Sequence, residues 1–528
     1  MRALLIYPIF PTSFWSFEQA VAGLGKKAFM PPLCLVTVAA LLPQDWDFRL
    51  VDRNVEELTD ADWDWAELVL LSGMIAQRDD FLALTREAKR RGKTVVVGGP
   101  YPTSLPHEHR EAGADFLVLD EGEETIPPFL EALEAGERSG EFRSTVKPDV
   151  TRVPVPRYDL LKLDAYFIMA VQYSRGCPFR CEFCDIIVLY GRKPRTKTAE
   201  QVQAELDALL ELGWRGGVFF VDDNFVGNRR TVKAFLRELI GWQEARGYPV
   251  SFYTEASVDM ADDDELLDLM VRAKFATVFL GIETPDAASL ERTMKQQNMR
   301  RPLEESVERI ARAGLRVMGG FIIGFDGETP GAGERVRRFA TDAAIPGVTF
   351  TMLQALPGTA LWKRLEAEGR LHEGANLNQT TLINFEPSRP VEEVAREYVE
   401  AFWALYEPKA YLTRVYRHFR MVGTAEVHAN PELRRALANR HKSDVNWRGV
   451  AFLLRTVWRQ GVVRDTRFMF WCYLLEMWRH NRPGIGNYLS FASFIEHFLP
   501  YRQLVRDNIE AQLAERAAAA KEAGSAAV

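Results

Sequence analysis

The sequence predicts an α/β protein in three parts: an N-terminal doubly wound parallel sheet, a central partial (β/α)6 barrel and a mostly helical C-terminal domain. Short apolar runs alternate with helical stretches over the first 135 residues. The same alternation restarts near residue 168 with six strand–helix repeats, and long amphipathic stretches replace it from about residue 372. The expected division is therefore as follows: first domain 1–140, linker 141–165, barrel 166–370, helical domain 371–528.

The composition is that of a globular protein in a reducing compartment. The chain has 528 residues, 47% hydrophobic, with a net charge of −7, so no overall basic field points to nucleic acid. Five cysteines in so long a chain do not form a disulfide framework. The start, MRALLIYPIFP, is typical of a first strand rather than a signal peptide. The apolar run FMFWCYLLEMW is too short to span a bilayer. We expect a cytoplasmic protein, with contact at the inner membrane face left open.

The predicted elements of the first two parts follow from short runs rich in β-branched and aromatic residues, separated by helical patterns. In the first part the strands are 3–8, 48–52, 68–73, 94–99 and 116–120, with helical stretches at 31–42 and 81–92. Charge, proline and glycine then mark the linker. In the second part the strands are 169–174, 217–222, 250–255, 276–282, 317–324 and 348–355, with helices such as 199–212, 230–246 and 303–314. Chemistry is expected at the carboxyl ends of the strands in both sheets.

Three cysteines lie within eight positions of the stretch SRGCPFRCEFCDI: Cys177, Cys181 and Cys184. The spacing is C-x3-C-x2-C. A structural zinc site usually has four ligands, and the histidine closest in sequence is His109. Three thiolates on one loop instead suit a 4Fe–4S cluster with one iron left open to a small molecule.

This motif, placed after the first strand of a β/α domain, resembles that of the radical S-adenosylmethionine superfamily. The resemblance implies that the three cysteines hold a 4Fe–4S cluster whose fourth iron binds the amino and carboxylate groups of S-adenosylmethionine. Phe183 matches the aromatic residue that lies near the adenine in that family.

Polar groups and glycines at the later strand ends match further positions of the family. The resemblance implies contacts with the amino group, the ribose or the adenine of S-adenosylmethionine for Asp222, Asp223, Asn224, Glu255, Glu283, Gly320, Ile322 and Gly324. The usual Gly-Gly-Glu is absent at the second strand, and one residue of Asp222–Asn224 could equally cap the following helix. The acidic residue after the fifth strand comes one place late, at Glu328.

The N-terminal domain resembles the cobalamin-binding module that precedes many such barrels. Its second and third motifs are matched at strand ends by Ser72, Gly73, Gly98, Gly99 and Pro100, where small residues leave backbone to line a pocket for the cofactor tail. DEGEET (120–125) resembles an acidic turn common in this group. The D-x-H-x-x-G motif is missing, and the first histidine is His107, so no histidine is placed to bind cobalt. Cobalamin binding is expected, and a domain that has lost the cofactor stays the alternative.

The C-terminal part is locally basic: residues 409–482 hold 15 Lys and Arg against 5 Asp and Glu. Tryptophans are interleaved with this charge: Trp447, Trp458, Trp471 and Trp478. The favoured interpretation is a helical cap with the tryptophans in its core and the arginines in solvent. The alternative is contact with an anionic membrane. Nucleic acid binding is not expected, because no binding motif accompanies the charge.

The order of the three parts resembles one subgroup, which includes the hopanoid C-2 methylase and related enzymes of lipid and tetrapyrrole biosynthesis. The resemblance implies a cobalamin-dependent methyltransferase that acts on an unactivated carbon of a small, apolar substrate. It also implies an electron donor such as flavodoxin or ferredoxin. Two alternatives stay open: a radical oxidative cyclase or carbon–carbon coupling enzyme without methyl transfer, and a non-enzymatic, membrane-associated iron–sulfur scaffold.

Overall fold

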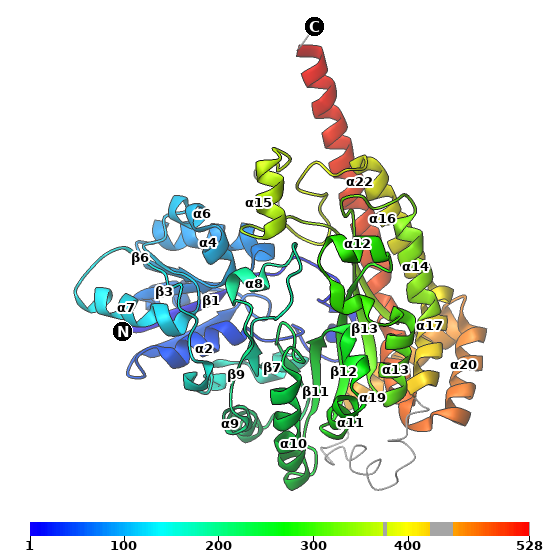
Figure 1. Cartoon of the computed structure of the whole chain (residues 1–528). Coiled ribbons are helices and arrows are strands. Elements are labelled where there is room, and N and C mark those ends of the chain that lie inside the picture. The colour runs from blue at the N-terminus through cyan, green and yellow to red at the C-terminus, as the bar shows by residue number, and fades with distance from the viewer. Residues whose placement is uncertain (373–376, 423–446, 527–528) are drawn as a thin grey trace. The chain divides into compact units, whose positions relative to one another are not determined.

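The computed structural model describes residues 1–372, 377–422 and 447–526 (Figure 1). The chain forms two compact units. Unit 1 consists of Met1–Thr12, Gly25–Phe179 and Cys184–Trp242. Unit 2 consists of Ser13–Leu24, Arg180–Phe183 and Gln243–Val528. The cysteine loop therefore contributes Cys177 and Cys184 to unit 1 and Cys181 to unit 2.

A six-stranded parallel sheet forms the first part of unit 1, in the order β2-β1-β3-β4-β5-β6. Its strands are β1 (Arg2–Tyr7), β2 (Asp47–Asp52), β3 (Leu68–Ser72), β4 (Thr94–Gly98), β5 (Phe116–Val118) and β6 (Gly140–Phe142). The sequence predicts the first five within a few residues. It misses β6, because three residues, one of them glycine, carry no alternation that identifies a strand.

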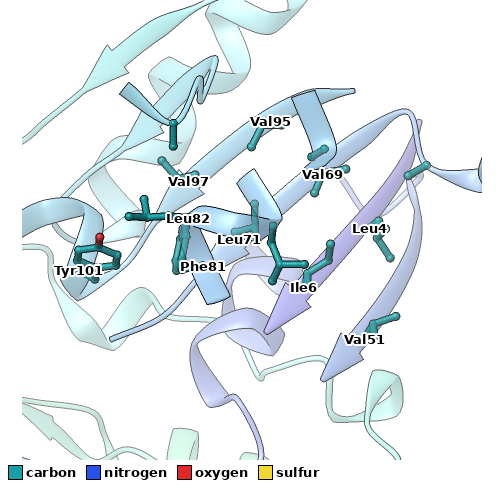
Figure 2. Close-up of a cluster of buried hydrophobic side chains, with 14 of the residues drawn as sticks. Leu4, Ile6, Val51, Val69, Leu71, Phe81, Leu82, Val95, Val97 and Tyr101 are labelled. Carbon is teal, nitrogen blue, oxygen red and sulfur yellow. The ribbon is translucent and has the colours of Figure 1, made fainter. Parts of the chain in front are cut away.

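On one face of this sheet, alternate residues of neighbouring strands form a buried cluster with the helices that cover it (Figure 2). Leu4 and Ile6 of β1 lie in the same cluster as Phe81 and Leu82 of α4 (Arg78–Arg90). The alternation follows from the two-residue period of a strand, which sends every second side chain to the same face. Helices α2 (Leu33–Leu41) and α7 (Gly122–Glu134) also pack on each other. The predicted doubly wound architecture is confirmed.

The order of the strands reverses at β1, since the chain places β2 on one side of it and β3 on the other. In open parallel sheets ligands bind at such a switch point, beyond the carboxyl ends of the strands. Ser72 ends β3 and Gly73 follows it, and Gly98 ends the next strand, β4, with Gly99 directly after it. The fold therefore places the predicted tail-pocket residues at the edge where a ligand belongs.

The remainder of unit 1 begins the second alternation. Strand β7 (Ile168–Val171) pairs in parallel with β10 (Gly217–Phe220), and α9 (Ala199–Glu211) and α10 (Arg229–Ala245) are its helices. The first strand is predicted to reach residue 174 but ends earlier. Its continuation, β8 (Ser174–Arg175), instead pairs antiparallel with β9 (Arg195–Thr196).

Unit 2 continues the alternation with four parallel strands, each followed by a helical segment. The strands are β11 (Ser251–Ala256), β12 (Phe275–Glu283), β13 (Arg316–Ile323) and β14 (Gly347–Met352). The main helices are α11 (Asp264–Arg272), α13 (Leu303–Ala313), α14 (Ala332–Asp342) and α15 (Ala360–Ala367). Together with β7 and β10 these make the six strand–helix repeats that the sequence predicts.

The C-terminal part of unit 2 is helical, as predicted. Its helices are α16 (Val391–Leu405), α17 (Pro408–Val422), α19 (Trp447–Trp458), α20 (Arg467–His480), α21 (Ile485–Ser493) and α22 (Ile495–Ala526). The favoured interpretation of its tryptophans is wrong: Trp447, Trp458, Trp471 and Trp478 are all exposed, because other apolar residues, among them Phe452, Phe470 and Met477, fill the inner faces of α19 and α20. Among the described residues, no helix is both long and apolar enough to cross a membrane.

Candidate functional site

The cysteine loop leaves β8 at Gly176 and is anchored by its own backbone. The Cys177 N–H donates to the Gly191 carbonyl at 3.2 Å, which closes the loop on itself. Cys181 is buried, while Cys177 and Cys184 are half-buried. In the part of the chain that the structure describes, no three His, Cys, Asp or Glu side chains converge on one metal position. A single zinc ion needs all its ligands about 2.3 Å from one point, whereas a cluster distributes its thiolates over several irons. Cys177, Cys181 and Cys184 stay the predicted cluster ligands.

The polar triplet after β10 holds the start of this loop within unit 1. The Asp222 carboxylate accepts hydrogen bonds from the backbone N–H groups of Tyr173, at 3.1 Å, and Ser174. Asp223 accepts from the Gly176 N–H at 3.2 Å. Burial raises the pKa of Asp222 to about 6 and that of Asp223 to about 7. These bonds explain why β7 ends early.

Asn224 is the member of this triplet that reaches a cysteine. Its Nδ2 lies 3.8 Å from the Sγ of Cys177, and its Oδ1 is buried without a hydrogen-bond partner in the described residues. An unpaired buried acceptor beside the cysteine loop suits a ligand group that donates a hydrogen bond, such as an ammonium group. None of the three residues caps α10. That role falls to Asn228, whose Oδ1 accepts from the Thr231 N–H at 3.3 Å.

The part of the loop in unit 2 contacts the strand ends of that unit. Gln297 Nε2 lies 3.8 Å from the Sγ of Cys181. The ring of Phe183 lies 5.9 Å from the ring of Phe325, just after β13, and the ammonium of Lys295 is 5.9 Å from the Phe183 ring centre. Lys295 also forms a largely buried ion pair with Glu283 at the end of β12. The structure thus places Phe183 and Glu283 beside one lysine, whose charge also acts on Cys181.

The other predicted residues of unit 2 lie on β11 and β13. Glu255 and Ile322 are half-buried. At Gly320 an added Cβ would approach the ring of Phe279 to 2.7 Å, so a side chain there would displace that ring. The Gly324 N–H donates to Glu328 Oε2 at 2.8 Å, and burial raises the pKa of Glu328 to about 7. The late acidic residue therefore folds the turn after β13.

At the edge of the N-terminal sheet, the predicted small residues bring bare backbone together. Gly99 has φ +95°, and an added Cβ would meet Ser72 Oγ at 2.4 Å. A Cβ on Gly98 would meet the Val118 carbonyl oxygen at 2.7 Å. The carbonyl of Gly73 accepts from the Tyr101 N–H at 3.2 Å, and Pro100 begins the short helix α5 (Pro100–Ser104). Side chains are thus excluded from the strand ends, as a backbone-lined cofactor pocket requires.

A buried ion-pair network joins this sheet edge to the cysteine loop, and most of its members carry no recognisable pattern in the sequence. Arg175, two residues before Cys177, bonds Glu121 at 3.0 Å and Glu123 at 2.8 Å. Arg195 bonds Glu121 at 2.8 Å as well. Burial raises the pKa of Glu123, but the hydrogen bonds and charge of Arg175 outweigh it and hold the pKa below its ordinary value. The acidic turn DEGEET was the one available signal, since no pattern marks its cationic partners.

Replacing Arg175 by glutamine is expected to destabilise unit 1. The change leaves Glu121 and Glu123 buried with one cation fewer, and breaking a buried pair costs about 3 kcal/mol. Urea unfolding followed by tryptophan fluorescence measures the loss. As a matched control, Arg90→Gln breaks an exposed pair with Glu87 and should leave the transition where it is. Equal midpoints for the two variants would contradict the expected role of the network.

Family models match all three parts of the chain. The Radical SAM superfamily model matches residues 171–340 and the B12 binding domain model matches residues 26–130. A domain of unknown function (DUF4070) matches residues 359–511. These matches confirm the cofactors that the motifs predict: a 4Fe–4S cluster and S-adenosylmethionine for the central domain, and cobalamin for the N-terminal one.

Curated relatives align over almost the whole chain. An uncharacterized methyltransferase of Synechocystis sp. is 58% identical over 97% of this chain and 94% of its own length. The hopanoid C-2 methylase of Rhodopseudomonas palustris is 35% identical over 95% of this chain and 93% of its own length.

A solved structure shares the fold. It is that of the cobalamin-dependent S-adenosylmethionine radical enzyme OxsB with aqua-cobalamin and S-adenosylmethionine bound, with a TM-score of 0.59 and 15% identity. The alignment covers 97% of this chain and 84% of that one. With the sequence relatives and the domain matches, it follows that the chain belongs to the radical S-adenosylmethionine enzymes that carry a B12-binding domain, in the methyltransferase group that includes the hopanoid C-2 methylase.

Proposed function

We propose that this enzyme transfers a methyl group to an unactivated carbon of an apolar, lipid-like substrate of the hopanoid or tetrapyrrole kind. When bound, the cluster and S-adenosylmethionine supply a radical initiator, and cobalamin supplies the methyl group. Cys177, Cys181 and Cys184 are the proposed ligands of the cluster.

One observation carries the proposal: within unit 1, the edge of the sheet that suits cobalamin is tied to the loop that suits the cluster. Arg175 bonds the acidic turn after β5 and stands two residues before Cys177. Methyl transfer to a substrate radical requires a methyl donor and a radical initiator that are held close together. In this proposal the methyl donor is held at one end of the link and the radical initiator at the other. Proximity of this kind removes the entropic cost of bringing the partners together.

The chain's own residues position and insulate these groups in the proposal. Asp222 and Asp223 hold the backbone that leads into the cysteine loop, and Asn224 offers its free Oδ1 to the ammonium of S-adenosylmethionine. Phe183 contributes an aromatic surface for the adenine. Gln297 directs an N–H toward the Cys181 sulfur, and such bonds tune the potential of a cluster.

The remaining predicted residues complete the proposed sites. Glu255 and Glu283 are proposed to contact the ribose or amino group, and Gly320, Ile322 and Gly324 to present backbone to the adenine. At the sheet edge the proposed cobalamin contacts are Ser72, Gly73, Gly98, Gly99 and Pro100. Glu283 is paired with Lys295, so its role would include fixing that ammonium beside Phe183.

The substrate class is supported by the relative of 35% identity, the hopanoid C-2 methylase, which aligns over nearly its full length. A substrate of this kind resides in a lipid phase, so the proposal includes work at the inner face of the membrane by a cytoplasmic enzyme. It also includes a one-electron donor such as flavodoxin or ferredoxin, because cleavage of S-adenosylmethionine consumes an electron.

Anaerobic reconstitution with iron, sulfide and hydroxocobalamin tests the proposal. We expect 5′-deoxyadenosine, and transfer of label from methyl-labelled S-adenosylmethionine to a component of a lipid extract, when dithionite is added. Cys177→Ala serves as the control that should form neither product. Deoxyadenosine with an unlabelled, oxidised product would favour a cyclase or coupling enzyme instead. No deoxyadenosine from a protein with full iron content would favour the scaffold alternative.

A further inference from the structure

The outer surface of α19, α20 and the π-helical turn between them, η8 (Arg459–Val463), is unusually apolar; we call it the α19–α20 face. Nine of the eighteen exposed large apolar side chains in the described residues fall within 32 consecutive positions here. The nine are Trp447, Leu454, Trp458, Val462, Val463, Phe468, Trp471, Leu475 and Trp478. Such a concentration marks an interaction surface, since single exposed apolar residues are ordinarily scattered.

The spacing of these residues shows that they form stripes and not scattered contacts. In α20 the exposed residues Phe468, Trp471, Leu475 and Trp478 recur at intervals of three and four, which places them along one side of the helix. In α19, Trp447, Leu454 and Trp458 recur at intervals of seven and four, which also places them along one side, and the exposed fractions of the two tryptophans are 77% and 61%.

The opposite sides of both helices are already used for packing. Phe470 and Met477 are completely buried on the inner side of α20, and Phe452 is buried on that of α19. The ring of Tyr473 stacks on Tyr416 of α17 at 4.1 Å. Figure 1 shows α20 beside α17 at the outside of unit 2. Both helices are therefore held in place by one side while a second apolar side faces outward.

The charge around the face is cationic. Residues 447–482 contain seven arginines, no lysine and two acidic residues, Asp465 and Glu476. Glu476 is already bonded by Arg420 and Arg479. The exposed Arg455, Arg467 and Arg482 form no ion pair among the described residues.

Two of these exposed arginines lie over exposed rings. The guanidinium of Arg482 is 3.9 Å from the centre of Trp478, and that of Arg467 is 5.0 Å from the centre of Phe468. Each pair joins an apolar ring to a cation at the same surface. Tryptophan and arginine together match the boundary of a bilayer, where rings lie at headgroup level and guanidinium groups meet phosphates.

We propose that the α19–α20 face rests on a lipid bilayer with anionic headgroups. Charge decides between this surface and a second copy of the chain. A symmetric dimer through the face would set the exposed Arg455, Arg467 and Arg482 against the same three arginines of the second copy. Anionic lipid instead neutralises them while the rings enter the acyl boundary. The inference explains how an apolar substrate could be reached, but it rests on the face alone and not on the proposed reaction.

Vesicle flotation of the full-length holoenzyme, without substrate or reductant, tests this. We expect binding to vesicles of phosphatidylglycerol and phosphatidylcholine, and at least tenfold weaker binding to phosphatidylcholine alone. The triple variant Leu454→Ser, Phe468→Ser, Leu475→Ser should lose at least tenfold in partitioning. The matched triple variant Val146→Ser, Val155→Ser, Leu212→Ser changes exposed apolar residues elsewhere and should bind as the unchanged protein does.

Charge is tested separately. The double variant Arg455→Glu, Arg467→Glu should weaken vesicle binding about fivefold or more for each residue replaced. Vesicle binding by this variant should also depend less on the salt concentration. Equal partitioning of the face variant and its matched control would overturn the proposal. So would a dimer, seen by light scattering, that the face variant dissociates. Because no turnover is measured, loss of methyl transfer with intact vesicle binding would count against the proposed function and not against this inference.

Discussion

Replacing Cys181 by alanine is expected to leave a folded protein that holds no 4Fe–4S cluster and forms no 5′-deoxyadenosine. A 4Fe–4S cluster has four irons, and the loop offers three cysteine ligands for it. The variant would leave two thiolates, which are too few to hold the cluster. Because the cluster is the source of the electron that cleaves S-adenosylmethionine, the loss should be total and not graded. Iron and sulfide content, visible absorption and deoxyadenosine formation after anaerobic reconstitution measure it.

The matched control for this variant is Cys472→Ala. Cys472 is exposed on α20 and far in sequence from the loop, so the control should keep full iron content and full cleavage. Circular dichroism separates loss of the cluster from loss of the fold. A Cys181→Ala protein with unchanged iron content and cleavage would refute the assignment of the cluster to this loop.

The variant Gly99→Ala is expected to lose cobalamin. Its Cβ would lie 2.4 Å from Ser72 Oγ, and alanine is strained at φ +95°. The Ser72 side chain must turn away and the backbone at residue 99 must change, so the edge can no longer present the same surface to the cofactor. Such overpacking costs about 1–3 kcal/mol of stability. Titration with hydroxocobalamin, followed by its absorption spectrum after gel filtration, measures the effect on binding.

Two further variants isolate the cause of that loss. Gly92→Ala imposes a similar positive φ, at +70°, with no atom within 4 Å of the new Cβ, and should bind cobalamin normally. The double variant Gly99→Ala, Ser72→Ala removes the hydroxyl that the Cβ meets and should recover part of the binding. If Gly99→Ala bound cobalamin as tightly as Gly92→Ala, the carboxyl edge of β3 and β4 would not be the tail pocket.

The fold could be predicted from the sequence wherever burial is complete. Strands such as β3 and β4 are apolar at nearly every position, because helices cover both faces of a parallel sheet. The end of the first barrel strand could not be predicted, since the carboxylate of Asp222 replaces a neighbouring strand as the partner of two N–H groups. The exposed tryptophans of α19 and α20 were mistaken for core, because an apolar stripe has the same spacing whichever way it faces.

The candidate site was predictable only where residues lie close in sequence. Three cysteines within eight positions form a pattern that can be recognised directly. Gln297 lies 116 residues from the cysteine it contacts, and Arg175 reaches back more than 50 residues to Glu121 and Glu123. Such partners become visible only in three dimensions, because nothing in a single sequence couples distant polar residues.

The buried link between Arg175 and the acidic turn has a consequence for how the protein can be divided. A fragment that ends before the barrel would keep two buried carboxylates without their cation, and a fragment that begins at the barrel would keep the cation without its anions. The stretch between them is also packed: Tyr158 is buried and donates to the Ala170 carbonyl at 3.0 Å. The sheet and the cysteine loop should therefore be expressed as one fragment, because neither piece alone keeps these ion pairs complete.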